Sequence, residues 1–351
     1  ATLYHYTAIG LNAWLAGRSG VWLVLWHNDV LDPNGYLTSM LGDLAVEEPV
    51  GREFPKVEVR HYRLPSGTTF SGEPPILHPA SFNFGNRLQL LGYSQTGDRQ
   101  VTLFWKALQP LDEDYLVSVI LRDTLGQAWG TWDGRPGAYY HPTERWRVDQ
   151  VVFGRYDLKL LPGAPPGDYG LEVGVYTTTD MAGLDVLDAA GAPQGKRVML
   201  GAVALSVAAA TPAEVEVPHA GRVELGDGLA LLGWDLDRTE AQPGDRLLLT
   251  LFWSVEVQPR GDDAVWVLVT DATGQPRGAG TFMPTSAWHP TSIWLPGQAW
   301  RGQITFRLPI DTQPGTARLA VQLLAADGTA ASGPAELTAL QVLPTNRVFA
   351  A

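Results

Sequence analysis

His141-Pro142-Thr143, followed by Trp146, returns 148 residues later as His289-Pro290-Thr291, followed by Trp294. Self-similarity at a fixed spacing indicates architecture before any local pattern does. The matching residues span a stretch as long as a domain. They therefore predict two similar domains in tandem and not a solenoid of short repeats. Further matches are Leu103-Phe104-Trp105 with Leu251-Phe252-Trp253, Asp123 with Asp271, Gly126-Gln127 with Gly274-Gln275, and, at an offset of 141, Leu90-Leu91-Gly92-Tyr93 with Leu231-Leu232-Gly233-Trp234.

Each copy reads as a series of short strands. Residues 101–105 and 247–253 are strand-like, and residues 123–126 and 271–274 resemble hairpin turns. About seven short strands in ~120 residues, without a convincing helix, are typical of an antiparallel sandwich. The expected fold is therefore mainly β: two tandem immunoglobulin-like antiparallel β-sandwiches preceded by a small α/β unit.

Residues 1–64 have a different pattern, which predicts the order α-β-α-β. The apolar run 21–26 is expected to be a strand buried on both faces. Asp32-Pro33 is expected to cap and begin a helix, because the apolar residues Leu37, Met40, Leu41 and Leu44 follow on one helical face. Residues 57–62 alternate like a half-exposed strand. Two strands are too few to stand alone, so this unit should either lean on another domain or be the tail of a truncated one.

The expected domains are the α/β unit at 1–64, a connector at 65–79, the first sandwich at 80–207, a linker at 208–219 and the second sandwich at 220–351.

Composition excludes several classes of function. The chain has 351 residues and a net charge of −12, which argues against nucleic acid as a partner. It has no cysteine, which excludes disulfides, thiolate zinc sites and cysteine nucleophiles. No run approaches the roughly 20 apolar residues of a membrane span. The chain opens on Ala1 without an initiator Met or a signal-peptide pattern, so we expect a fragment of a longer protein.

The first candidate site is aromatic. Aromatic rings at a sheet edge can stack on the apolar C–H face of a sugar, which makes the residues around the repeated motif of the first copy candidates for ligand binding. The alternative is that the repeated residues plug the end of each core, and their presence in both copies favours that alternative. The candidates are Trp129, Trp132, Tyr139, Tyr140 and His141.

The second candidate site follows the first strand. His27, Asp29 and Asp32 lie where that strand ends and a helix begins, the edge at which open α/β sheets place ligands. They could bind a metal ion or act as acid and base. The alternative, which we favour, is that Asp32 caps the helix and Asp29 stabilises the loop.

Carboxylates also cluster in equivalent loops of the two copies, at residues 112–114 and 262–263. Such clusters can bind calcium, but the spacing of an EF-hand is missing and a solvated turn is the favoured interpretation. The chain contains no recognisable catalytic motif, and we expect neither a metal nor a cofactor.

The whole pattern resembles one family. The residues that carry the resemblance are the block 21–35, the stretch 54–62, and the Leu-Leu-Gly-Tyr and Leu-Phe-Trp motifs. Together they are similar to the extracytoplasmic C-terminal region of bacterial multi-span glycosyltransferases of the protein-mannosyltransferase type, which use polyprenyl-phosphate sugars. In that family the catalytic acidic residue lies in a loop between membrane spans. The resemblance therefore implies a membrane-tethered parent and carries no catalytic residue over to this chain.

Three hypotheses follow for function. The first is a non-catalytic extracytoplasmic accessory region of a membrane glycosyltransferase that contacts a glycan or a lipid-linked sugar acceptor. The second is an independent carbohydrate-binding or cell-surface adhesion module. The third and weakest is a hydrolase that uses His27, Asp29 and Asp32.

Overall fold

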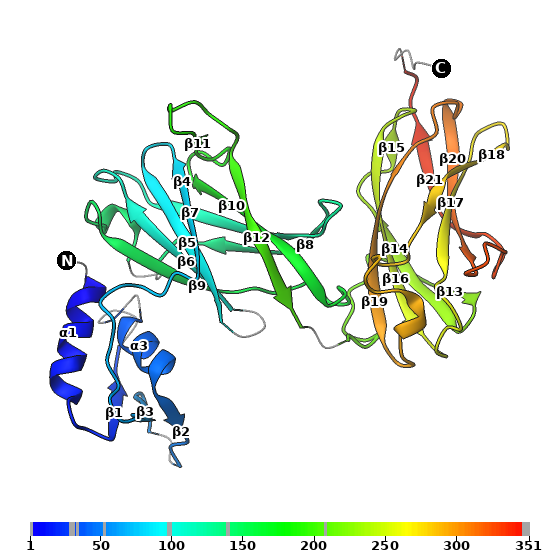
Figure 1. Ribbon diagram of the computed structural model, residues 1–351. Coiled ribbons are helices and arrows are strands. Elements are labelled where there is room, and N and C mark those ends of the chain that lie inside the picture. The colour runs from blue at the N-terminus through cyan, green and yellow to red at the C-terminus, as the bar shows by residue number, and fades with distance from the viewer. Residues whose placement is uncertain are drawn as a thin grey trace. The chain divides into compact units, whose positions relative to one another are not determined.

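The computed structural model describes residues 3–27, 32, 35–51, 54–96, 100–137, 141–206 and 209–345 (Figure 1). The chain forms two compact units. Unit 1 comprises residues 1–159 and 169–203, and unit 2 comprises residues 160–168 and 204–351. The fold is mainly β, as expected, and the helices of the described part, α1 (Leu3–Leu15) and α3 (Tyr36–Leu44), both lie near the N-terminus.

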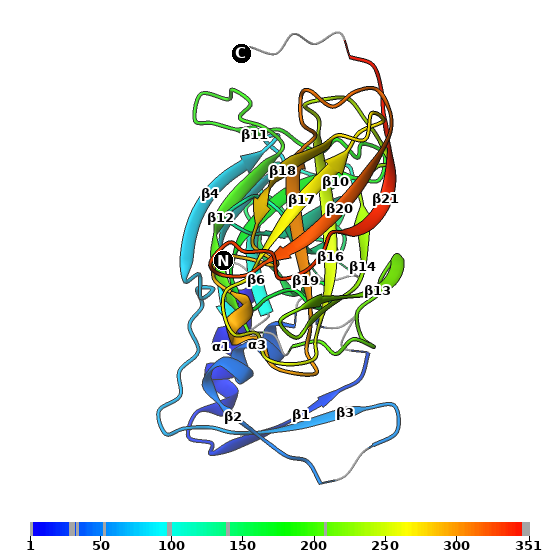
Figure 2. The ribbon, with the colours of Figure 1, turned by 90° about the vertical axis from the view of Figure 1, so that its right-hand side faces the viewer.

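The N-terminal part of unit 1 contains a small antiparallel sheet. Its strands are β1 (Gly20–Leu25), β2 (Val46–Glu48) and β3 (Glu58–Arg63), in the order β1-β3-β2. Figure 2 shows α1 and α3 on one side of this sheet. The expected order α-β-α-β is therefore present, with β2 as an additional short strand that the sequence pattern did not predict.

The α/β unit leans on the first repeat, as expected for so small a sheet. Residues of α1 and α3 share a buried cluster with Tyr62 of β3 and with two phenylalanines of the first repeat, Phe104 and Phe153. The ring of Phe153 lies 5.0 Å from that of Tyr36 and 6.0 Å from that of Tyr4. The two helices therefore fill the space between the small sheet and the first large sheet of unit 1.

Strand β1 differs from the expectation. The apolar run 21–26 predicted a strand buried on both faces, but Trp22 and Val24 are 59% and 62% exposed. Successive side chains of a strand point to opposite faces, and the helices cover only the face that carries Val21 and Leu23. The expectation was wrong because three short strands have a cover on one side only.

Helix α3 also begins later than expected. Gly35, with φ 63°, precedes the helix, and the first helical residue is Tyr36. The capping function of Asp32 is nevertheless confirmed, because its Oδ1 accepts the N–H of Tyr36 at 3.0 Å and its Oδ2 accepts that of Leu37 at 2.9 Å.

Two further sheets make up the first repeat. One has the order β12-β10-β7-β8 and the other the order β11-β4-β5-β6-β9. Their bounds are β4 (His78–Phe84), β5 (Leu88–Thr96), β6 (Gln100–Ala107), β7 (Tyr115–Arg122), β8 (Ala128–Gly134), β9 (Val151–Asp157), β10 (Gly167–Thr177), β11 (Val186–Leu187) and β12 (Arg197–Leu205), with a 3-10 turn, η1, at Thr143–Arg145.

The second repeat, in unit 2, has the sheet orders β13-β14-β16-β19 and β15-β21-β20-β17-β18. Its strands are β13 (His219–Gly226), β14 (Leu229–Leu236), β15 (Glu240–Ala241), β16 (Arg246–Val255), β17 (Ala264–Thr270), β18 (Pro276–Phe282), β19 (Ala299–Arg307), β20 (Gly315–Leu324) and β21 (Ala335–Val342), with η2 at Thr291–Ile293. Side chains from both sheets enclose one buried core.

The two repeats have the same strand order. The order β4-β5-β6-β9 corresponds to β13-β14-β16-β19, and β12-β10-β7-β8 corresponds to β21-β20-β17-β18. The offset between the copies changes from 141 at the Leu-Leu-Gly motif to 148 at the Leu-Phe-Trp motif, so the second copy has seven extra residues between these motifs. They include β15, which pairs in parallel with β21. The two copies of the repeated sequence therefore fold with the same strand topology.

Two glycines explain one repeated motif. Gly92 and Gly233 lie at a register shift in β5 and β14, with φ of 140° and 151°. A Cβ atom at either position would clash with a backbone carbonyl oxygen of the neighbouring strand, that of His78 or His219. Only glycine satisfies both restrictions, which is why Leu-Leu-Gly occurs at both places.

The His-Pro-Thr motif makes the same hydrogen bonds in both copies. The Thr143 hydroxyl accepts the N–H of Tyr115 at 2.8 Å and donates to the carbonyl of Glu113 at 2.8 Å. The Thr291 hydroxyl accepts the N–H of Asp263 at 2.8 Å and donates to the carbonyl of Gly261 at 2.9 Å. Each fully buried threonine thus ties the loop before η1 or η2 to the start of a core strand.

We expect Thr143→Val to lower the free energy of unfolding by about 1–3 kcal/mol, because the buried N–H and carbonyl would lose their partner while the volume stays the same. Thr131→Val, at an exposed position of β8, is the control and should change stability by less than about 0.5 kcal/mol. Urea denaturation measures both values, and equal effects would contradict the assigned role of Thr143.

Candidate functional site

Trp129, a candidate for sugar stacking, is fully buried. Its indole N–H donates to Oδ2 of Asp123 at 2.8 Å, while Oδ1 of that aspartate accepts two backbone N–H groups of the hairpin turn. The ring has no exposed face on which a sugar could stack. Trp129 therefore belongs to the core, because the strand pattern points it inward and the turn aspartate satisfies its one polar atom.

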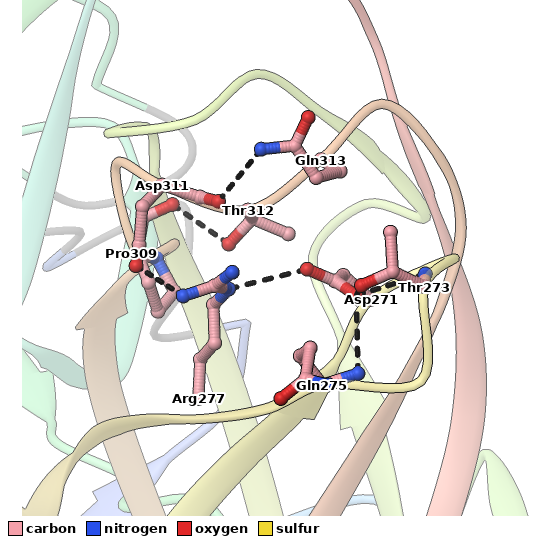
Figure 3. Close-up of polar contacts among 8 residues, drawn as sticks. All are labelled: Asp271, Thr273, Gln275, Arg277, Pro309, Asp311, Thr312 and Gln313. Carbon is pink, nitrogen blue, oxygen red and sulfur yellow. Dashed lines mark hydrogen bonds and ion pairs between the residues drawn. The ribbon is translucent and has the colours of Figure 1, made fainter.

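The second copy has Arg277 at the position of Trp129, 148 residues further on. Figure 3 shows Arg277 directed at Asp271, the counterpart of Asp123, with a distance of 3.2 Å between Nε and Oδ2. Arg277 also pairs with Asp311. Hydrogen bonds from Thr273, and the bond from Arg277, lower the pKa of Asp271 to about 2. Both copies therefore have an aspartate in the hairpin turn. Its Oδ2 atom accepts a hydrogen bond from Trp129 in the first copy and from Arg277 in the second.

Trp132 and His141, two other candidates from the first copy, are half-buried. The Trp132 ring meets the ring of Tyr156 edge-on at 4.2 Å. The His141 ring stacks over Trp146, and burial followed by the charge of Arg145 lowers its pKa. Tyr139 and Tyr140 lie outside the described residues. Of the aromatic candidates that the structure describes, Trp129, Trp132 and His141 therefore do not form one exposed platform.

His141 has a counterpart in His289, whose ring stacks over Trp294 in the same way. Burial lowers the pKa of His289 to about 4, and the Nε2 atoms of both histidines are buried without a hydrogen-bond partner. A histidine that is neutral at pH 7 and packed on a tryptophan fits the interpretation of the repeated motif as a plug for the end of the core.

The second predicted site is not assembled in the described part of the chain. His27 is exposed, with φ 50°, and its ring contacts Trp26. Asp32 uses both carboxylate oxygens to cap α3. Asp29 lies outside the described residues. The argument from open α/β sheets also fails, because that argument concerns parallel strands and β1 pairs antiparallel with β3.

The two carboxylate clusters differ between the copies. In the first copy, Asp114 pairs with Arg135 at 2.7 Å. In the second, Oδ2 of Asp263 is buried without a hydrogen-bond partner. Within the part of the chain that the structure describes, no group of three or more His, Cys, Asp or Glu side chains is arranged to hold a metal ion.

Asp263 is the most perturbed carboxyl of the second repeat. It is 1% exposed and takes the position that Tyr115 has in the first copy. Burial, together with the negative charges of Asp227 and Asp262, raises its pKa to about 7. A buried carboxyl next to two others retains a proton that the unfolded chain releases near pH 4.

This shift sets the sign of a pH dependence. Between about pH 4 and pH 7 the folded protein binds more protons at Asp263 than the unfolded chain, so wild-type stability falls as pH rises. Asp263→Asn should remove that slope, with little change at pH 4 and a gain of roughly 2–4 kcal/mol at pH 8. Urea denaturation of both proteins from pH 4 to pH 8 measures the difference. Parallel stability curves would show that Asp263 does not titrate in this way.

The exposed feature that the sequence pattern missed is the outer face of the small sheet, which we call the aromatic face. It consists of Trp22, Val24 and Trp26 along β1 and its end, with His61 on the neighbouring strand. Trp22 and Trp26 are 59% and 60% exposed. The missed signal is the alternation along β1, which places Trp22 and Val24 on one face of the strand. Trp26 follows directly after the end of that strand.

Polar groups border the aromatic face. The ring of His61 stacks on that of Trp22, with centroids 4.2 Å apart and planes 19° from parallel. Glu48 of β2 contacts Nδ1 of His61 at 3.2 Å and Nε of Arg63 at 2.8 Å. The aromatic face therefore has the Trp22 ring stacked on His61, and beside it the charged groups of Glu48 and Arg63, which can accept and donate hydrogen bonds.

No protein-family model matches the sequence, and neither does any curated protein. Neither of the helices that the structure describes is long and apolar enough to cross a membrane.

Proposed function

We propose that this chain is a non-catalytic extracytoplasmic accessory region of a membrane glycosyltransferase. In this proposal, two tandem immunoglobulin-like sandwiches follow an N-terminal unit whose aromatic face contacts a glycan or a lipid-linked sugar acceptor. The exposure of Trp22 on the outer face of β1, and of Trp26 just after the end of that strand, is the observation that carries the binding role. The membrane-bound parent rests on the resemblance of residues 21–35 and 54–62 to such enzymes.

Strand order supports the immunoglobulin-like part of the proposal. If β5 and β6 are strands A and B, then β7, β8, β9, β10 and β12 correspond to C, C′, E, F and G. The sheets then read A-B-E and G-F-C-C′, with β4 added beside A. This is the division of strands between the two sheets of immunoglobulin-type domains. The same assignment applies to the second repeat, strand for strand.

Physical chemistry supports a sugar as the ligand of the aromatic face. One side of a pyranose ring carries mainly C–H groups, and these pack well on the face of an indole. The hydroxyl groups at the edge of the sugar need charged or polar partners, which Glu48 and Arg63 supply beside Trp22. An exposed patch of this kind on a protein surface usually has a binding role.

Trp22→Ala and Trp26→Ala should each weaken glycan binding about tenfold, because one stacked aromatic contributes on the order of 1–1.5 kcal/mol. Trp14→Ala is the matched control, since Trp14 is 73% exposed but lies on helix α1. A glycan array identifies ligands of the wild-type chain, and titration calorimetry then compares the variants. A wild-type chain that retains no glycan, or variants that bind like the control, would refute the role of the aromatic face.

The alternative function is an independent carbohydrate-binding or cell-surface adhesion module. The aromatic face would serve that function equally well, so binding data alone do not separate the two. The full reading frame does: a series of apolar membrane spans encoded upstream of these residues supports the glycosyltransferase, and their absence supports the independent module.

A further inference from the structure

Unit 1 contains a pocket of about 330 Å³ that shares no residue with the aromatic face. Its walls come from helices α1 and α3, from the connector, and from strands β5, β6 and β9. The residues that line it are Tyr4, Ser39, Asp43, Leu44, Pro75, Leu77, Ser94, Thr102, Phe104, Phe153 and Arg155. A pocket of this size with mainly apolar walls and a few polar groups is typical of small-molecule sites.

The floor of the pocket has a polar row and an aromatic row. The strand register sets Ser94 of β5 beside Thr102 of β6, and Thr102 beside Arg155 of β9. Two residues along the strands, Phe104 lies beside Phe153. Their ring centroids are 5.9 Å apart. A ligand in this pocket therefore meets hydrogen-bonding groups at one end and, at the other, the small apolar surface that the largely buried rings of Phe104 and Phe153 leave open.

Two opposite charges line the polar end. Arg155 donates a hydrogen bond from its guanidinium to the buried hydroxyl of Ser39. Burial raises the pKa of Asp43 above its usual value, and the charge of Arg155 and a hydrogen bond with Ser39 offset only part of that rise. Ser39 therefore connects the two charged groups through a single hydroxyl. An arginine has five N–H donors, so Arg155 keeps donors that can bind a ligand.

We propose that this pocket binds a small zwitterion with an apolar body, the chemistry of a free hydrophobic α-amino acid. The ligand carboxylate binds Arg155, its ammonium group binds Asp43, and its side chain lies over Phe104 and Phe153. A lone anion would be repelled by Asp43 and a lone cation by Arg155, so only a ligand with both charges satisfies the site. The proposal does not depend on glycan binding, because it concerns other residues and another ligand.

Titration calorimetry of the whole chain at pH 7 tests the proposal with three compounds of one shape. These are L-phenylalanine, 3-phenylpropionate, which lacks the ammonium group, and 2-phenylethylamine, which lacks the carboxylate. We expect L-phenylalanine to bind about tenfold or more tightly than either analogue, because each analogue leaves one charged side chain without its partner. No binding by any compound, or equal binding by all three, would overturn the proposal.

Charge-removing variants sharpen the test. Asp43→Asn should strengthen binding of phenylpropionate relative to phenylalanine, and Arg155→Gln should do the same for phenylethylamine. Arg155→Lys keeps the positive charge and should keep the wild-type order of the three compounds. Arg145→Gln and Asp112→Asn remove exposed charges outside the pocket and are the controls. If the Asp43→Asn and Arg155→Gln variants are folded by circular dichroism and still retain the wild-type order, the proposal is refuted.

Discussion

Two short helices have two sheet faces to cover in unit 1, and the candidate sites follow from this constraint. Helices α1 and α3 have 13 and 9 residues. They pack against Tyr62 of the small sheet and also against Phe104 and Phe153 of the first large sheet. Because the two helices lie between the small sheet and the large sheet, they cannot also cover the outer face of the small sheet. The aromatic face is therefore left exposed, and the space that the helices do not fill beside Phe104 and Phe153 is the pocket.

Unit 2 shows the same sheet face with a different cover. Phe252, the counterpart of Phe104, is buried by Ala210 and Val215 from the segment between the repeats. The guanidinium of Arg301, the counterpart of Phe153, lies 4.7 Å above the Phe252 ring. The two repeats thus have one topology and differ in what covers their outer sheet face. The added layer of unit 1 supplies the aromatic face, and together with β5, β6 and β9 of the first repeat it forms the pocket.

Much of the fold was predictable because the deciding residues leave little choice. Gly92 occupies a backbone conformation that only glycine tolerates, and Thr143 fills a buried position that needs both a donor and an acceptor. Both residues have an identical counterpart in the second copy, Gly233 and Thr291, so the sequence alone reveals the repeat. The candidate sites were predicted less well. Trp129 was expected to lie at the surface. Strand alternation instead directs its side chain into the core, where the Asp123 carboxylate accepts a hydrogen bond from the indole N–H. The pocket joins residues as distant as Tyr4 and Arg155, and no local pattern relates them.

The sequence by itself determined that the chain is mainly β, that one topology is used twice, and that a small α/β unit precedes it. It could do so because periodicity and turn residues act over a few neighbours, and a duplication repeats them. Only the tertiary structure decided which apolar residues are covered. The run 21–26 has the composition of a strand buried on both sides, yet Trp22 and Val24 are exposed. Burial depends on the number of layers that reach a face, and that number is a property of the whole unit, which no stretch of sequence contains.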